Sequence, residues 1–489
     1  MTGGDTTERR TALASQGLFV VLVLLVPFGF ASLPTIFNDG DVSWHVAAGQ
    51  WILDHRALPH ADPFSLTAGG RPWVPLEWLP EVIYALAWRA AGHAGLAAVG
   101  AAALMALHGV VFVHLRTRAA PPAIVAALLL MDVALATFTL ARPHVLVWPL
   151  LAAWTALLAR SAESGRPPPL AAALLLVLWT NLHGSFPLAA IIAAPLAFDA
   201  LVKAKWATLK QWLIFAAASF VALCLNANGL DGLLHPLRIA QLTTLHLILE
   251  WQPSTPGATP LFYAVLAAGL AALLWRGARL PPGRLVLLLA LLLMAFSQVR
   301  HQSWFVIVAA LLVPPVLGGT AEPARRLVPL ALLALPLLLL RAALPITPVE
   351  NSANPVQLIA AIAPDLRDKP VFNGYSMGGP LILAGIKPYI DGRQDLYGDA
   401  FFADYSAIAD GDFARFNRAV ARYGIRWTIL GNGNRELIGE LDRSGEWRRV
   451  YADKVGVIHV RREAPSASAA RPGSGAISPP EARPAQRPA

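Results

Sequence analysis

Long apolar runs alternate with short polar segments along most of this chain, and this pattern predicts membrane-spanning helices. Runs of about 17 to 25 apolar residues are long enough to cross a hydrocarbon core of about 30 Å. The run at 18–37 follows Arg9 and Arg10, but no small-residue cleavage site ends it, so we interpret it as a retained helix and not as a signal peptide. We expect an α-helical polytopic membrane protein with about eleven spans, at approximately 18–37, 94–115, 121–140, 145–160, 170–184, 186–202, 208–226, 259–275, 285–299, 302–319 and 326–345.

The pattern also predicts how the chain is divided before its last third. Residues 1–17 are expected to be a cytoplasmic N-terminal segment, 18–345 the membrane module, and 38–93 a long first loop on the outer side. Within that loop, residues 78–88 are amphipathic and carry Trp and Tyr, which suits a helix lying on the membrane surface.

Residues 346–463 have the composition of a soluble domain, and their short apolar runs predict an α/β fold. The last stretch, 464–489, is rich in Pro, Ala, Ser and Arg without periodicity, so we expect a disordered tail. The elements expected in the α/β domain are strands at 371–372, 388–390, 427–430 and 455–460 and helices at 381–384 and 413–423.

Composition agrees with the membrane assignment. The chain has 489 residues, of which 56% are hydrophobic and 14% charged, whereas soluble domains carry about 25% charged residues. The net charge of +9 could suggest nucleic acid, but Lys and Arg that mark one face of a membrane protein explain it better, so no nucleic-acid partner is expected. The single cysteine, Cys224, excludes an intrachain disulfide framework and a cysteine-based metal site.

The basic residues predict the orientation. If the N-terminus is cytoplasmic, every even-numbered connection between spans is cytoplasmic and basic, as the positive-inside rule requires. We therefore expect a multi-pass membrane protein whose C-terminal domain lies outside the cytoplasm. The residues on these connections are Arg116, Arg118, Arg160, Arg166, Lys203, Lys205, Lys210, Arg276, Arg279, Arg284, Arg325 and Arg326.

The same assignment of spans and orientation places other polar side chains at the outer ends of the spans. Such groups are costly near lipid unless they face water, a partner or a substrate. The cytoplasmic connections hold Lys and Arg with Pro and Gly, and this asymmetry predicts chemistry on the outer side. The candidate site residues are Asp39, Asp41, His45, Glu77, Arg142, His144, Asn181, His183, Glu250, Arg300 and His301.

Each candidate also has a purely structural interpretation. Asp39 could cap the next helix, and Arg142 and Arg300 could either grip phosphate oxygens or snorkel to the interface. Asn181 lies at a predicted helix break, where it could line a cavity or join helices by hydrogen bonds. Glu250 is either a second acid of the site or a surface carboxylate.

The densest polar cluster of the C-terminal domain is Asp391-Gly392-Arg393. Arg393 could reach an anionic or sugar ligand, so Asp391 and Arg393 are candidate substrate-binding residues. Turn chemistry and a structural ion pair would also explain them. The glycine-rich segment 373–379 lacks the Lys-Ser/Thr of a P-loop and the spacing of a dinucleotide fingerprint, so we reject a nucleotide site.

Together these segments resemble bacterial polytopic membrane proteins of the GT-C glycosyltransferase superfamily. The resemblance implies location in the bacterial inner membrane, a GT-C-like membrane module, a polyprenyl-phosphate-linked sugar donor and an inverting transfer on the outer face of that membrane. It also implies a catalytic acid in the first outer loop, which in this chain is Asp39 or Asp41. The stretches that carry it are 39–52, 62–65, 77–79, 142–144, 181–184 and 391–393.

Two roles for the first-loop acids stay open. Asp39 or Asp41 could act as the general base that takes the proton of an acceptor hydroxyl. Alternatively, both acids with His45 could hold a divalent cation, Mg or Mn, that neutralises the leaving phosphate. Arg142 and Arg300 would bind the phosphate of a donor embedded in membrane lipid, and the C-terminal domain would help to hold a glycan, lipid or protein acceptor.

Two other functions fit parts of the same pattern. A transporter or flippase for a lipid-linked or polar solute would share the helix break and the buried His and Asn, and would move its substrate without forming a covalent product. A non-catalytic membrane assembly protein would use the outer domain for docking and would not need the first-loop acids.

Overall fold

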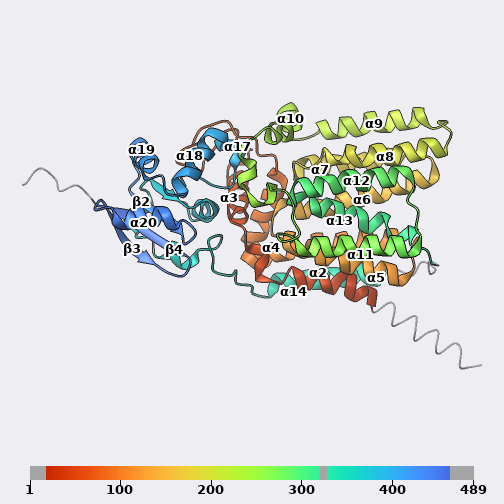
Figure 1. Ribbon diagram of the computed structural model, residues 1–489, viewed down its shortest axis with the longest axis horizontal. Helices are drawn as coiled ribbons and strands as arrows, with labels where there is room; N and C mark the ends of the chain where they lie inside the picture. Colours follow the sequence, from red (N-terminus) through yellow and green to blue (C-terminus); the bar gives the residue numbers. More distant parts are fainter. Residues whose placement is uncertain (1–17, 320–327, 463–489) are drawn as a thin grey trace, which may run out of the picture.

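The structure is a computed structural model that describes residues 18–319 and 328–462. A bundle of apolar helices is followed by a small α/β domain at one end of the bundle (Figure 1). The segments 1–17 and 464–489, and the basic pair Arg325 and Arg326, lie outside the described residues.

The helices of the bundle follow the predicted apolar runs. Proline lies in the first turn of α5, α6, α11 and α12, where its missing N–H leaves no hydrogen bond unmade. The bounds are η1 Val21–Leu25, α2 Val26–Phe30, α4 Trp78–Leu115, α5 Pro121–Leu135, α6 Pro143–Ser164, α7 Leu174–Leu182, α8 Leu188–Lys203, α9 Leu209–Cys224, α11 Pro260–Arg276, α12 Pro282–Ser297, α13 Gln302–Leu312 and α14 Val328–Ala343.

Shorter helices connect the helices of the bundle. They include α3 and α10, which lie where the bundle meets the α/β domain (Figure 1). Their bounds are η2 Pro34–Phe37, α3 Asp41–His55, η3 Ala136–Phe138, η4 Leu170–Ala173, α10 Gly229–Ala240, η5 Thr244–Leu247, η6 Leu249–Trp251, η7 Val299–His301 and η8 Pro314–Val316.

The predicted count of about eleven spans is not confirmed. In the described part of the chain, four helical stretches are long and apolar enough to cross a membrane: Trp78–Leu115, Pro121–Phe138, Pro143–Ser164 and Val299–Val316. A fifth would be formed by α9 and α10, which meet at a bend of 92°. The other apolar helices are shorter, because the apolar runs include turns and 3₁₀ segments as well as helix. The chain is a multi-pass membrane protein with several short apolar helices.

Helix α4 joins two predicted elements. The helix expected on the membrane surface at 78–88 and the span expected at 94–115 form one helix of 38 residues with a kink at Ala91 and Gly92. Gly92 has a φ of 54°, a left-handed conformation that glycine adopts without a Cβ clash. The kink lets the outer part of α4 turn toward α3 while its inner part stays in the bundle.

The C-terminal domain contains a four-stranded sheet in the order β1-β2-β4-β3. Strand β1 pairs parallel with β2, and the other two pairings are antiparallel. The strands are β1 Val371–Asn373, β2 Trp427–Gly431, β3 Trp447–Ala452 and β4 Gly456–Arg461, and the helices are α15 Val356–Ala360, η9 Pro364–Leu366, η10 Tyr375–Met377, α16 Gly378–Leu383, α17 Gln394–Tyr397, α18 Asp399–Ala409, α19 Phe413–Tyr423 and α20 Arg435–Arg443.

One predicted strand of this domain is wrong. Residues 388–390 belong to no strand of the sheet. The Asn373 side chain takes the place of a neighbouring strand: its Oδ1 accepts a hydrogen bond from the Tyr389 N–H at 2.7 Å, and its Nδ2 donates to the Ile390 carbonyl at 2.8 Å. The predictions at 371–372, 427–430, 455–460 and 413–423 are confirmed, whereas β3 was not predicted.

The first outer loop and the C-terminal domain share a hydrophobic core. Trp44 and Trp73 belong to the same buried cluster as Phe372, Tyr389 and Phe416. Residues more than 300 positions apart in the chain therefore fold together, and the loop forms one wall of the domain.

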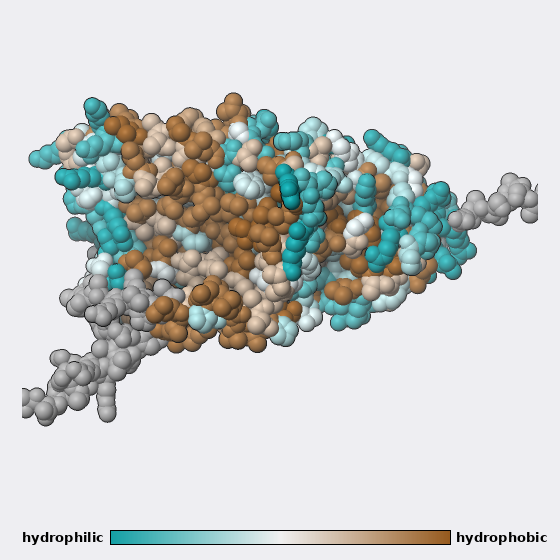
Figure 2. Space-filling view, turned by 180° about the vertical axis from the view of Figure 1, so that it is seen from behind, coloured by the Kyte–Doolittle hydropathy of each residue, from teal (hydrophilic) through white to brown (hydrophobic). Residues whose placement is uncertain are grey.

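The surface separates apolar and polar regions. A broad apolar band covers the helical bundle, and hydrophilic groups gather over the C-terminal domain and at the far end of the bundle (Figure 2). At the far end, Glu163 contacts Arg284 at 2.9 Å and Arg118 at 3.2 Å, and its carbonyl accepts a hydrogen bond from Lys203. Three of the predicted basic connections thus meet at the end of α6 that points away from the C-terminal domain.

Candidate active site

The centre of the candidate site is the guanidinium group of Arg142. Its Nη1 lies 2.9 Å from Oδ2 of Asp39, and its Nη2 lies 2.9 Å from Oδ2 of Asp41. Nη1 also lies 3.4 Å from Oε2 of Glu250. One cation therefore joins three carboxylates, two from the turn before α3 and one from η6.

Local sequence explains how these groups are presented. Arg142 precedes Pro143, which disfavours a helical conformation, so Arg142 is extended (φ −122°, ψ 156°) and its side chain leaves the start of α6. Asp39 accepts a hydrogen bond from the Asp41 backbone N–H at 2.8 Å, which closes the turn before α3. The N-cap of α3 is Gly40, which has no side-chain cap, so Asp39 closes the preceding turn and does not cap the helix. The same carboxylate contacts Arg142.

Glu250 is held in place by a segment bound to the C-terminal domain. Asp399 accepts hydrogen bonds from the backbone N–H groups of Thr243 and Thr244, and the Gln394 amide donates to the Thr244 hydroxyl at 2.6 Å. These contacts fix η5, and η6 follows directly with Glu250.

Arg300 is the second cation of the site. Its Nη1 lies 3.6 Å from Oε1 of Glu250, and its guanidinium lies 4.1 Å from the centre of the Trp251 ring, a cation–π contact. His144 and His301, which lie close in sequence to the two arginines, contact backbone carbonyls. His144 Nε2 lies 2.9 Å from the Phe138 carbonyl, and His301 Nδ1 lies 3.2 Å from the Met294 carbonyl.

A second polar cluster lies beside the first. Glu77 is 3.5 Å from His45 Nε2 through one oxygen and 3.2 Å from His183 Nε2 through the other. Glu81, one turn further along α4, lies 3.6 Å from Nδ1 of His45, and both side chains are about 1% exposed. Glu81 was not among the predicted site residues; its spacing of four residues from Glu77, at the start of an otherwise apolar helix, was the available signal.

The acids of the site differ in their readiness to take a proton. Burial raises the pKa of Asp41 from 3.8 to about 7, although the Arg142 guanidinium opposes the shift. Burial likewise raises the pKa of Glu77 to about 7. For Glu250 burial acts in the same direction, but Arg142 and Arg300 outweigh it and lower the pKa to about 2. The lowered pKa keeps Glu250 ionised at neutral pH, whereas the pKa values of Asp41 and Glu77 lie near neutral pH.

Asn181 maintains the predicted helix break. Its Oδ1 accepts hydrogen bonds from Trp78 Nε1 and the Ala227 N–H, both at 3.0 Å. Its Nδ2 donates to the carbonyls of Val177 and Leu225, both at 2.8 Å. Both polar atoms of the side chain bind other protein groups, which agrees with the interpretation that Asn181 joins helices by hydrogen bonds.

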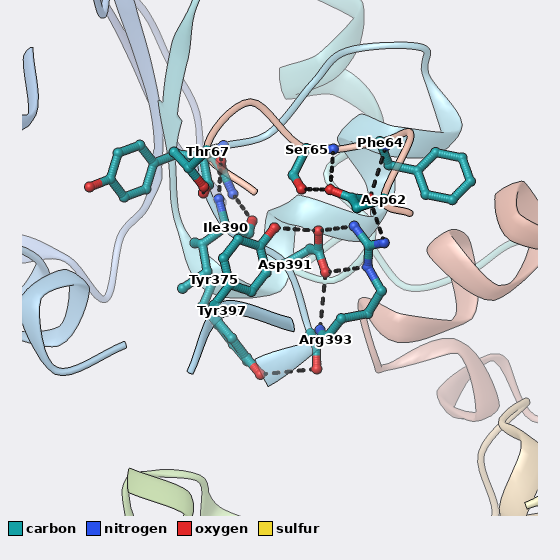
Figure 3. A network of polar contacts seen from close by, with 12 residues as sticks. Asp62, Phe64, Ser65, Thr67, Tyr375, Ile390, Asp391, Arg393 and Tyr397 are labelled. Atoms are coloured by element: carbon teal, nitrogen blue, oxygen red, sulfur yellow. Dashed lines mark hydrogen bonds and ion pairs between the residues drawn. The ribbon is translucent and has the colours of Figure 1, made fainter. Parts of the chain in front are cut away.

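Gly392 packs against Asp41, but its two neighbours, Asp391 and Arg393, belong to a separate buried ion network. Both side chains are at most 1% exposed, and Arg393 lies between Asp391 and Asp62 (Figure 3). The two residues that were predicted to bind substrate are paired with other protein groups.

The arrangement around Asp39 and Asp41 is not that of a metal centre. Among the described residues, no group of three or more His, Cys, Asp or Glu side chains is placed to hold a metal ion. Arg142 lies between the two carboxylates, and His45 faces Glu77 and Glu81. These donors do not fit a divalent cation as they stand, and no reaction step is derived through one.

Comparison with known proteins identifies the class of fold. No protein-family model and no curated protein matches the chain. A structure of the oligosaccharyltransferase AglB from Archaeoglobus fulgidus, with an inhibitory peptide and a dolichol-phosphate, matches with a TM-score of 0.53 and 12% identity over 86% of this chain and 70% of that one.

A second structure supports the same class. The Archaeoglobus fulgidus oligosaccharyltransferase tethered to an acceptor peptide matches with a TM-score of 0.52 and 12% identity, covering 92% of this chain and 74% of that one. The predicted resemblance to GT-C glycosyltransferases is thereby confirmed at the level of the fold. At this identity the likeness establishes the fold alone, so activity has to be argued from the site.

Proposed function

We propose that this protein is a GT-C-type glycosyltransferase that transfers a sugar from a polyprenyl-phosphate-linked donor to an acceptor outside the cytoplasm. The observation that carries the proposal is the contact of Arg142 with Asp39 and Asp41 at one end of an apolar bundle. It places a group suited to phosphate beside a carboxylate suited to take a proton, both of which a sugar transfer requires.

Arg142 and Arg300 are the proposed phosphate ligands. Both guanidinium groups contact the carboxylate of Glu250, so they converge on one position. Guanidinium groups bind phosphate oxygens in the same geometry as carboxylate oxygens, and more strongly as the charge of the anion rises. A donor phosphate that enters this position would share the two arginines with Glu250.

Asp41 is the proposed base. In the transfer, the acceptor oxygen attacks the anomeric carbon, and the bond from that carbon to the phosphate oxygen breaks. The acceptor proton passes to Asp41, and the polyprenyl phosphate leaves with the bonding electrons and is stabilised by Arg142 and Arg300. A single displacement of this kind inverts the configuration at the anomeric carbon.

The structural neighbours support the chemical class of the substrates in a general way. One AglB structure contains a dolichol-phosphate and a peptide. By analogy, we propose a polyprenyl-phosphate sugar as donor and a glycan, lipid or protein as acceptor.

The test is transfer of a radiolabelled sugar from polyprenyl-phosphate donors by purified protein in lipid. We expect Asp41→Asn to lower the rate by about 10² to 10⁴-fold, because the amide cannot accept the proton. Asp54→Asn is the matched control: this acid lies on α3, pairs with Arg89 and is 61% exposed, so transfer should stay at the wild-type level.

Full transfer by both Asp39→Asn and Asp41→Asn would contradict the assignment of the base. Substrate movement without a labelled product from any donor would instead favour a transporter or flippase. A chelator added to the same assay tests for Mg or Mn; we expect transfer to persist, because the Arg142 guanidinium occupies the position between the two first-loop carboxylates.

A further inference from the structure

The turn that carries Asp39 and Asp41 packs directly against the backbone of the C-terminal domain. A Cβ atom added to Gly40 would collide with the Ser376 carbonyl oxygen, and one added to Gly379 would collide with the Gly40 carbonyl. A Cβ atom added to Gly392 would collide with Oδ1 of Asp41 itself. A Cβ atom at Gly40 or Gly379 would force backbone atoms apart, whereas one at Gly392 would displace the Asp41 side chain.

The segment around Gly392 is fixed by its two neighbours. Oδ1 of Asp391 accepts hydrogen bonds from the backbone N–H and the Nε of Arg393, at 3.0 and 2.9 Å. Oδ2 accepts hydrogen bonds from Nη2 of Arg393 and from the Tyr397 hydroxyl, both at 2.7 Å (Figure 3). Four hydrogen bonds to the Asp391 carboxylate therefore hold the turn that contains Gly392.

The same arginine reaches the first outer loop. Nη1 of Arg393 lies 2.8 Å from Oδ1 of Asp62, and Asp62 also accepts hydrogen bonds from the Phe64 and Ser65 N–H groups at 3.0 and 3.1 Å (Figure 3). The Arg393 guanidinium lies 4.8 Å from the centre of the Trp73 ring. The network thus joins the loop to the C-terminal domain across 331 positions of sequence.

The charged groups of this network are all paired within the protein and do not face a substrate. The side chains of Asp62 and Asp391 are 0% exposed and that of Arg393 is 1% exposed. Every oxygen of Asp391 and every nitrogen of the Arg393 guanidinium has a partner within the protein. A buried ion network that is completely paired resists displacement, because losing one member leaves an uncompensated charge.

We propose that Asp62, Asp391 and Arg393 are positioning residues that hold Gly392 against Asp41, so that the C-terminal domain sets the distance between the Asp41 carboxylate and Arg142. This inference rests on the proposed function for its effect on catalysis. Its structural part, that the network orders the first outer loop, stands without it.

The first test is Gly392→Ala. The added methyl group displaces the Asp41 carboxylate, and a misplacement of about 1 Å in a reacting group costs about 100-fold in kcat, while the KM for the donor should change little because Arg142 and Arg300 remain. The matched control is Gly433→Ala in the same domain, where an added Cβ meets no atom within 4 Å. Wild-type kcat in Gly392→Ala, or an equal loss in Gly433→Ala, would overturn the proposal.

The second test needs no transfer assay. Asp391→Asn keeps the size of the side chain and removes its charge, and hydrogen exchange is measured on the full-length protein in lipid. We expect faster exchange in peptides that cover 39–50 and 60–73, with no change at 143–164. Unchanged exchange in the first two regions would overturn the positioning role.

The two experiments separate the two hypotheses. If the wild-type protein transfers no sugar, the proposed function fails, and the exchange result alone supports or overturns the ordering of the loop. If the wild type transfers sugar and Asp391→Asn leaves both exchange and kcat unchanged, the positioning role fails while the proposed function stands.

Discussion

At the scale of single residues, the same chemical group has different properties in different surroundings. The Asp41 side chain is 18% exposed beside one arginine, whereas Asp391 is fully buried and enclosed by four donors. Glu250 lies between two arginines and stays ionised. Only an acid that can both lose and regain a proton near neutral pH suits the role of a base.

The pKa of Asp41 predicts how transfer depends on pH. Burial raises this pKa to about 7, so the proton leaves only as the pH rises through about 7, and the active, deprotonated base is lost below it. We expect kcat/KM to fall tenfold per pH unit on the acid side of about pH 7.

The Glu250→Gln variant is a second test of Asp41 as the base. The negative charge of Glu250 raises the pKa of Asp41, so its removal should move the acid limb to lower pH. Asp54→Asn should leave the limb in place. A wild-type profile that stays flat down to the ordinary aspartate value of 3.8 would argue against Asp41 as the base.

At the scale of elements, two interruptions of helices shape the site. The kink at Gly92 turns the outer part of α4, with Glu77 at its start, toward α3. The break after α7 places His183 beside Glu77. Sequence composition indicated the break, but the kink joins two segments that were predicted as separate elements.

The break depends on Asn181. Replacing it with alanine removes the partners of Trp78 Nε1 and the Ala227 N–H, and a buried polar group without a partner costs about 1 to 3 kcal/mol. We expect Asn181→Ala to lower the unfolding temperature measurably in detergent. Asn228→Ala, which loses one bond of 3.2 Å to the Pro75 carbonyl, should have a smaller effect. Equal unfolding temperatures for both variants would show that Asn181 does not hold the break.

At the scale of the whole molecule, polar groups are divided between the two ends of the bundle. Basic residues meet around Glu163 at one end, and the acids, histidines and arginines of the site meet at the other, next to the C-terminal domain. By the positive-inside rule, the end with Glu163 is cytoplasmic and the site is outside.

This orientation can be tested by cysteine labelling. In a Cys224→Ser background, a cysteine in place of the exposed Lys454 should react with a membrane-impermeant maleimide in intact cells. A cysteine in place of the exposed Arg279 should react only after the membrane is opened. The parent Cys224→Ser protein is the unlabelled control, and the reverse pattern would place the site in the cytoplasm.

The sequence by itself determined the features that depend on neighbouring residues. It predicted the apolar helices, the break at Asn181 and the helix at 413–423, because periodicity, proline and local charge act over short distances. It also predicted that the connections on one side of the membrane carry Lys and Arg, whereas those on the other side carry acids, histidines and asparagines. It also selected Asp39, Asp41 and Arg142 as candidates, because polar groups at the ends of apolar runs are exceptional.

Only the tertiary structure decided which of these groups act on one another. It placed Arg142 between Asp39 and Asp41, and it paired Arg393 with Asp62 across 331 positions. It also showed that the first outer loop and the C-terminal domain share one core. Burial and ion pairing depend on neighbours in space, and here those neighbours come from segments whose separation in the chain exceeds the reach of any local pattern.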